Sequence, residues 1–155
     1  FGLLFPLRRE LTEVSYLGLG PRETTVDRTA GSKMGAWNYN VREDFAQNSP
    51  VYPQECGSRT GVYSAAVTGS GLNIGIGFAG DGMTFSALPY TPHELENARH
   101  LYELPRDDNK TVVRCALFQR GVGGDNSWGA KPHGDACFAV EKGMAFSFSI
   151  QKQNG

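Results

Sequence analysis

Short segments in which large apolar residues alternate with small or polar ones recur along the chain, and glycine or proline separates them. Residues 144–150 place Met, Phe, Phe and Ile between Ala and Ser, and residues 72–78 alternate in the same way. A period of two residues is that of a β-strand with one buried face. With 20 glycines and 8 prolines available for turns, the sequence predicts an all-β protein. Further strands are expected at 34–41, 62–67, 83–87 and 111–118.

One short helix is expected within this pattern. Thr91 can cap its start, Pro92 suits its first position, and Glu94 completes a Thr-x-x-Glu capping box. The helix should run to about Arg99, because a proline soon afterwards prevents a longer one. The length suits a single domain over residues 1–155. We therefore predict an antiparallel β-sandwich with one short helix.

Charge and cysteine usage narrow the functional classes. The net charge of −1 gives no basic surface for nucleic acid, and no apolar run is long enough to span a bilayer. The three cysteines, Cys56, Cys115 and Cys137, are widely spaced, which is not typical of a secreted disulfide framework. A reducing cytoplasm is the simpler interpretation. The first residues lack an initiator Met and a basic region, so the chain looks like a piece of a longer protein.

Residues 121–129, Gly-Val-Gly-Gly-Asp-Asn-Ser-Trp-Gly, predict an irregular loop whose backbone uses glycine's freedom at positive φ. Trp128 stands near its end. Two interpretations are open from the residues alone. The indole can fold back as a lid on the local core, which is the common fate of a tryptophan. Alternatively, its flat face can match the apolar C–H face of a sugar ring, with backbone N–H groups of the loop near the hydroxyls.

Four blocks of residues occur in an order that carries more information than any one of them. They are 16–21 followed by Glu23, Asp27 and Arg28; 53–57 with Arg59; 85–92 followed by 94–96 and His100; and the loop at 121–129. Together they span nearly the whole chain. In these blocks the chain resembles the C-terminal domain of family 2 β-galactosidases, which are retaining glycosidases.

The resemblance implies a fold and a role. The chain would be the later part of a large two-layer supersandwich related to galactose mutarotases. Trp128 would reach into a sugar site formed mainly by another domain, and Asp125 and Asn126 would shape the loop that presents it. The two catalytic glutamates would lie in a separate barrel domain, and other domains would bind the family's magnesium and sodium ions. This chain would then supply no catalytic carboxylate, no metal ligand and no cofactor site.

Other motifs have structural interpretations that we favour over functional ones. Residues 75–80 match Gly-x-Gly-x-x-Gly, but a turn and a strand follow where a dinucleotide site needs a helix. Cys115, His133 and Cys137 lack the close pairing of a zinc site. A set of charged residues beside turns could form an acid/base pair, but turn-fixing hydrogen bonds are the preferred interpretation. That set is Glu23, Asp27, Arg28, Glu55 and Arg59.

The leading hypothesis is therefore the C-terminal part of a cytoplasmic β-galactosidase that cleaves terminal β-galactosides such as lactose with retention. Its partners would be the galactoside substrate and the rest of the enzyme, either in one chain or as a large catalytic subunit, in an oligomeric parent. The main alternative is a free-standing carbohydrate-binding β-sandwich module. A mutarotase-like enzyme would need a histidine and an acid converging in the sandwich's own cleft, and the sequence shows no such pair.

Overall fold

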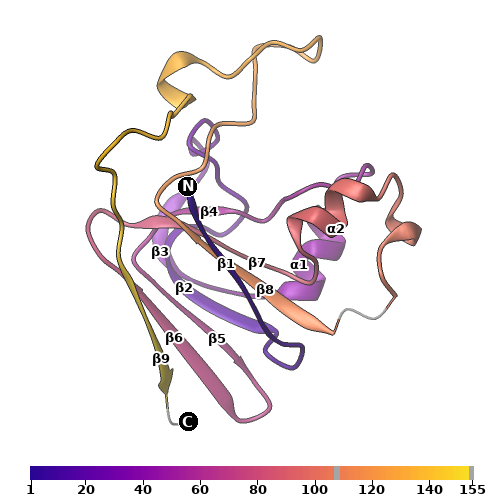
Figure 1. Ribbon diagram of the computed structural model, residues 1–155, viewed down its shortest axis with the longest axis vertical. Helices are drawn as coiled ribbons and strands as arrows, with labels where there is room; N and C mark the ends of the chain where they lie inside the picture. Colours follow the sequence, from indigo (N-terminus) through magenta and orange to yellow (C-terminus); the bar gives the residue numbers. More distant parts are fainter. Residues whose placement is uncertain (107–108, 154–155) are drawn as a thin grey trace.

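Two antiparallel sheets face each other in the computed structural model, which describes residues 1–106 and 109–153 (Figure 1). The four-stranded sheet has the order β1 (Gly2–Arg8), β8 (Lys110–Ala116), β7 (Met83–Leu88) and β4 (Arg59–Val62). The five-stranded sheet has the order β3 (Lys33–Asn40), β2 (Glu13–Gly20), β5 (Ser64–Gly69), β6 (Leu72–Phe78) and β9 (Phe148–Gln153). The predicted all-β antiparallel sandwich is confirmed.

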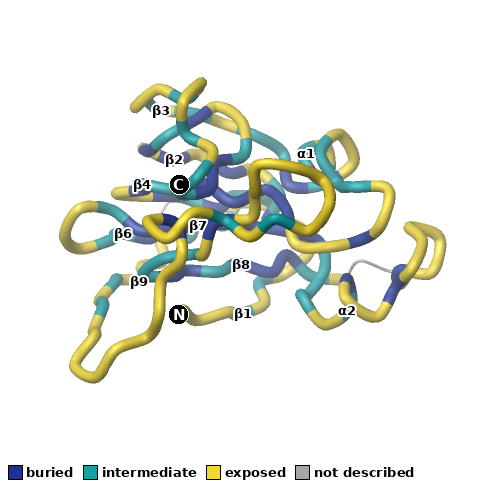
Figure 2. The backbone as a smooth tube through the Cα atoms, turned by 90° about the horizontal axis from the view of Figure 1, so that it is seen from above, coloured by how far each residue is buried: buried dark blue, intermediate teal, exposed yellow. Residues whose placement is uncertain are grey.

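The main core lies between the two sheets. Val14 and Ile76 contribute to it from the five-stranded sheet, and Phe85, Val113 and Cys115 contribute from the other. These side chains are at most 2% exposed. Each belongs to the inward face of its strand, as the alternation of apolar residues requires. Figure 2 shows buried backbone through β7 and β8, so the centre of the four-stranded sheet is covered on both faces.

Two α-helices cover the outer face of that sheet. The predicted capping box is present in α2 (Pro92–Asn97): the backbone N–H of Glu94 donates to Thr91 Oγ1, and that of Thr91 donates to Glu94 Oε2. The helix ends at Asn97, two residues before the predicted end. A further helix that the sequence analysis did not predict, α1 (Val41–Asn48), follows β3 directly. Asn40 caps α1, since its side chain accepts from the backbone N–H groups at the start of the helix.

The predicted strands at 34–41, 72–78, 83–87 and 111–118 are present within two residues of each bound. Residues 62–67 contain the end of β4 and most of β5, and the prediction omitted β1 and β2. The prediction for 144–150 was wrong at its start, because β9 begins at Phe148 and continues to Gln153. Its partner explains the shift: β6 ends at Phe78, which lies opposite Phe148, so the ladder has no strand to pair with further back.

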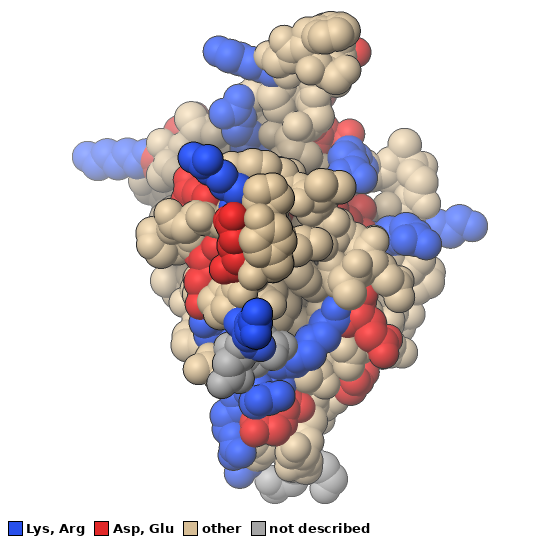
Figure 3. All heavy atoms as spheres, turned by 90° about the vertical axis from the view of Figure 1, so that its right-hand side faces the viewer, with Lys and Arg blue, Asp and Glu red and all other residues tan. Residues whose placement is uncertain are grey.

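Residues 75–80 do not open a helix. Gly75 and Gly77 lie within β6, and a turn with positive φ at Gly80 and Gly82 leads straight into β7. The structural interpretation of this glycine pattern is confirmed. No helix within 1–106 and 109–153 is long and apolar enough to cross a membrane. Figure 3 shows basic and acidic side chains interspersed over the face that carries the helices, in keeping with the small net charge.

Candidate functional site

The glycine-rich segment 121–129, here called the Trp loop, lies in the long connection between β8 and β9. Figure 1 shows this connection projecting beyond one end of the sandwich. Its residues form bends and turns with neither helix nor strand, as predicted. A short 3-10 helix, η2 (Gly134–Ala136), follows the loop, and the N–H of Gly121 donates to the carbonyl of Ala136 at 2.9 Å. This bond closes the base of the projection.

A carboxylate from the other end of the sequence fastens the start of the Trp loop. The backbone N–H of Gly123 donates to Asp27 Oδ2 at 2.6 Å, across 96 residues of chain. The hydroxyl of Thr25 donates to the second oxygen, Asp27 Oδ1, also at 2.6 Å. Burial acts to raise the pKa of Asp27, but the hydrogen bonds from Thr25 and from the N–H groups of Gly123 and Val122 outweigh it and hold the pKa below its usual value. The group is therefore ionised at neutral pH.

The tip of the loop presents Trp128 to solvent. Asn126 Oδ1 accepts from the backbone N–H of Trp128 at 2.8 Å, which forms a tight Asx turn just before the indole. The Trp128 side chain is 91% exposed. The interpretation of Trp128 as a lid on the local core is therefore wrong for this chain. The structure places Asn126 where it shapes the loop.

Asp125 contacts a residue further along the same connection. Its Oδ1 lies 2.8 Å from His133 Nε2, and both side chains are mostly exposed. The hydrogen bond and the charge of Asp125, with a smaller contribution from Asp135, raise the pKa of His133. Beneath this pair is a polar hollow of about 420 Å³. Its lining residues are Val26, Asp27, Arg28, Gly123, Gly124, Asp125, His133, Asp135 and Ala136.

The glycines of the loop serve a purpose that differs from the predicted one. Among them only Gly129 has a positive φ. Gly121 and Gly124 are needed for space: a Cβ at Gly121 would lie 2.8 Å from both Ala136 Cβ and the Asp27 carboxylate, and one at Gly124 would meet the carbonyl oxygen of Ala130 at 2.1 Å. The backbone at Gly124 therefore packs closely against that of Ala130, and the start of the loop packs closely against Asp27.

The other charged residues singled out from the sequence take part in three ion pairs within the described residues. Arg59 is buried and donates to Asp44 Oδ1 at 3.0 Å. Glu55 pairs with Arg114 at 2.6 Å, on the outer side of the four-stranded sheet. Arg28 lies 4.0 Å from Glu23. Burial of Glu23 raises the pKa of its carboxyl. Each therefore fixes a local connection, as the preferred interpretation held, and the role of Asp27 at the Trp loop was not foreseen.

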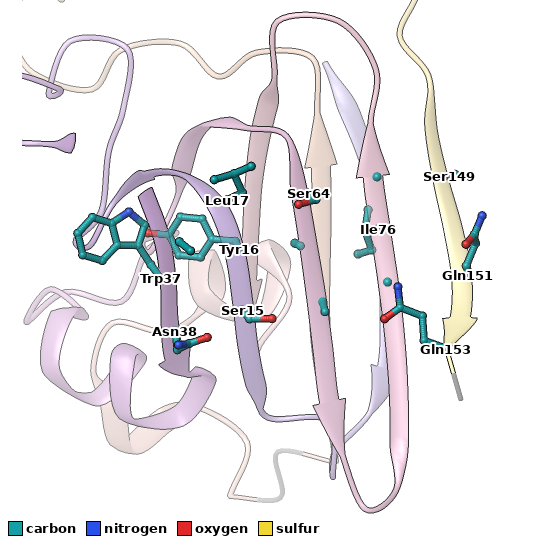
Figure 4. A pocket seen from close by; sticks show the side chains of 15 residues that line it. Ser15, Tyr16, Leu17, Trp37, Asn38, Ser64, Ile76, Ser149, Gln151 and Gln153 are labelled. Carbon is teal, nitrogen blue, oxygen red and sulfur yellow. The ribbon is translucent and has the colours of Figure 1, made fainter. Parts of the chain in front are cut away.

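A second hollow lies on the outer face of the five-stranded sheet and measures about 430 Å³. Ala and Gly make its floor, and Gln153 lies over Gly75. Its polar side chains are Ser15, Asn38, Ser64, Ser149, Gln151 and Gln153 (Figure 4). Hydroxyl and amide groups of this kind can hydrogen-bond a polyol, but the hollow holds no charged group.

The cysteines and histidines offer no metal centre in the described residues. Cys115 is buried, and burial raises the pKa of its thiol to about 12. Cys137, by contrast, is exposed, and its Sγ lies 3.4 Å from the carbonyl of Pro132. His133 is engaged with Asp125. The donors needed around a zinc ion therefore do not meet among these residues.

Comparison with known proteins gives a consistent result over the whole chain. The family described as "Beta galactosidase small chain" matches residues 1–150. The chain is 39% identical over 153 residues to the "Beta-galactosidase" of Lactobacillus delbrueckii subsp. bulgaricus, with 97% of this chain and 14% of that protein covered. The corresponding values for the "Beta-galactosidase" of Halalkalibacterium halodurans are 35%, 98% and 15%.

A shorter relative is the "Beta-galactosidase small subunit" of Latilactobacillus sakei. It is 37% identical over 141 residues, which cover 84% of this chain and 43% of that subunit. The chain thus spans less than half of the small subunit and about a seventh of the long relatives.

Proposed function

The chain belongs to the β-galactosidase small-chain family, and on that premise we propose that it is a segment of a β-galactosidase that hydrolyses terminal β-galactosides such as lactose with retention. In this proposal it is the later part of the C-terminal sandwich of a cytoplasmic, oligomeric family 2 enzyme. The remaining sequence is either the same long chain or a large catalytic subunit. The partial coverage of every relative reported above supports a partner of this kind.

The segment's contribution to the site is an aromatic wall. The observation that carries this role is the 91% exposure of Trp128 on a loop whose start is held by the bonds from Gly123 to Asp27 and from Gly121 to Ala136. The indole has a large flat apolar face, and such a face exposed on a loop can stack on the apolar C–H face of a sugar ring. Asn126 fixes the turn before Trp128, and Asp125 ties the loop to His133. Both therefore act as loop-shaping residues at the substrate site.

The bond-breaking chemistry comes from elsewhere in the parent. Retention needs a nucleophile and an acid/base carboxylate about 5–5.5 Å apart. The aspartate beneath the start of the Trp loop and the aspartate within it are already committed: Asp27 accepts from Thr25 and Gly123, and Asp125 pairs with His133. The described residues also contain no group of three or more His, Cys, Asp or Glu side chains that could hold a metal ion. We therefore assign the two catalytic carboxylates, and the magnesium and sodium ions, to other domains of the parent.

The test is the Trp128→Ala variant of the full-length parent enzyme. Loss of ring stacking, about 1–2 kcal/mol, should raise KM for a chromogenic β-galactoside about 5- to 30-fold while the melting temperature stays unchanged. Trp128→Phe should recover part of the loss, because a flat ring remains. Tyr102→Ala is the matched control, since Tyr102 is an aromatic residue 78% exposed in the 3-10 helix η1 (Leu101–Glu103), away from the loop (Figure 1). Normal kinetics in Trp128→Ala would overturn the proposal.

A free-standing carbohydrate-binding module is the second candidate. The uncharged hydroxyl and amide groups of the outer hollow favour it, because such groups suit a polyol. This candidate predicts that the isolated chain binds galactose or lactose saturably and below millimolar in a calorimetric titration. The β-galactosidase segment proposed above predicts no such binding. One aromatic wall alone falls short of the roughly 4 kcal/mol that millimolar affinity requires.

A further inference from the structure

The start of the Trp loop touches a part of the sandwich that is itself firmly held. Thr24 and Thr25 are at most 1% exposed. The N–H of Thr24 donates to the carbonyl of Ser58 at 2.8 Å, and Thr24 Oγ1 accepts from the N–H of Thr60 in β4 at 2.8 Å. Asp27 follows this buried pair and receives the Thr25 hydroxyl. The adjacent residues Thr24 and Thr25 therefore link β4 to the Asp27 carboxylate through their hydrogen bonds.

The Trp loop meets the sandwich through that carboxylate. Among the described residues, the hydrogen bond that leaves 120–130 for the sandwich is the one from Gly123 to Asp27, and the N–H of Val122 also acts on the pKa of that carboxyl. The other bonds of the loop stay within the projection, as from Gly121 to Ala136. The lack of room for a Cβ at Gly121, 2.8 Å from Asp27, shows how closely the two surfaces fit.

Two features of the Trp loop lie between the residues that Asp27 binds and the indole. The segment 124–130 is pinched where Gly124 meets the Ala130 carbonyl, and Asn126 fixes the turn before Trp128. Residues 121–123, here called the hinge, connect this closed unit to the rest of the chain. The Asp27 carboxylate binds there. Fixing the hinge thus fixes the backbone from which the ring projects.

We propose that Asp27 is a positioning residue for sugar binding: its carboxylate anchors the hinge of the Trp loop to β4 through Thr24 and Thr25, and so holds Trp128 in its binding orientation. The inference rests on the proposed function, because it assumes that Trp128 meets the sugar. Asp27 itself touches no substrate. It acts through the backbone N–H groups of Val122 and Gly123.

Hydrogen exchange in the full-length parent enzyme tests the anchor directly. A hydrogen bond to a charged acceptor slows local opening, so Asp27→Ala should speed exchange at Gly123 about tenfold or more. Asp27→Asn keeps one acceptor oxygen and should give an intermediate rate. Asp135→Ala is the matched control. Asp135 is an acid that lines the same hollow, but Asp27 is the carboxylate that accepts hydrogen bonds from the loop's N–H groups. Amides of β8 should keep their protection in all variants, which excludes global unfolding.

Kinetics test whether the anchor acts through the indole. Asp27→Ala should raise KM severalfold with little change in kcat, and Asp27→Asn should restore part of the affinity. Combined with Trp128→Ala, the Asp27→Ala change should have no further effect, because the ring that it positions is gone. Independent, multiplying losses in the double variant would overturn the proposal, and so would unchanged exchange at Gly123. Neutral kinetics in Trp128→Ala alone would overturn the proposed function, whereas faster exchange in Asp27→Ala would still establish the anchor.

Discussion

Replacing Asp44 with alanine should destabilise the chain by about 3–5 kcal/mol, because it leaves the Arg59 guanidinium buried without its counter-charge. Arg59 is 1% exposed and Asp44 is 12% exposed at the side chain, and the ion pair joins Arg59 of β4 to α1 at 3.0 Å. Arg59 also lies 4.9 Å from the centre of the Tyr39 ring, so its charge sits in an aromatic environment. Beyond Asp44, Arg59 Nη1 donates to the carbonyl of Ser58 at 3.4 Å and the Glu23 carboxyl interacts with its charge, while Nε has no hydrogen-bond partner among the described residues.

The expected loss corresponds to a fall in melting temperature of about 6–20 °C for a domain of this size. Urea unfolding of the chain, followed in parallel by tryptophan fluorescence and circular dichroism, measures it wherever the two transitions coincide. Asp81→Ala is the matched control, because Asp81 is exposed in the turn between β6 and β7. Removing both charges, with Asp44→Ala and Arg59→Met together, should recover part of the loss. A loss below about 1 kcal/mol for Asp44→Ala, as for an exposed pair, would refute this reasoning.

Three further predictions concern the chain alone and the loop. The isolated chain should show no turnover of a chromogenic β-galactoside, and carboxylate-dependent turnover after stringent purification would contradict the assignment of the chemistry to another domain. Calorimetric titration of the chain with galactose should show no saturable binding below millimolar, since one wall leaves most hydroxyls in water. The pKa of His133 is raised in the folded state by its hydrogen bond with Asp125, so the bond stabilises the loop below the unfolded pKa and is lost as pH rises through the folded one. The protection of the amides at 124–128, taken relative to the intrinsic exchange rate at each pH, should therefore fall above about pH 6.5, and Asp125→Asn should abolish that fall; protection that does not change with pH would count against the pairing.

Features encoded by neighbouring residues were predictable from the sequence. The capping box that starts α2 needs residues three apart, and the alternation in β6 is visible within seven. Helix α1 was missed because the alternation at 34–41 continues into Val41, while the capping signal lies in Asn40. The start of β9 was missed because the end of β6 sets it, and that partner is far away in sequence.

The candidate site also combines features that the local sequence predicts with features that it does not. The irregular Trp loop and the turn formed by Asn126 follow from local composition. The choice between a buried and an exposed Trp128 depends on where the whole projection lies, which no local pattern fixes. The bond between Asp27 and Gly123 spans 96 residues, and only the packing of the two sheets brings them together. Whether Trp128, Asp125 and Asn126 contact a sugar stays a prediction.

The central claim is that this chain contributes an aromatic wall, and no catalytic carboxylate, to a galactoside site. A crystal structure of the full-length parent with galactose bound tests it most directly. The proposal predicts that the Trp128 ring lies against the apolar face of the sugar at van der Waals distance, about 4 Å, with the catalytic carboxylates supplied by another domain. A sugar bound away from Trp128, or a carboxylate of this chain at the anomeric carbon, would contradict it.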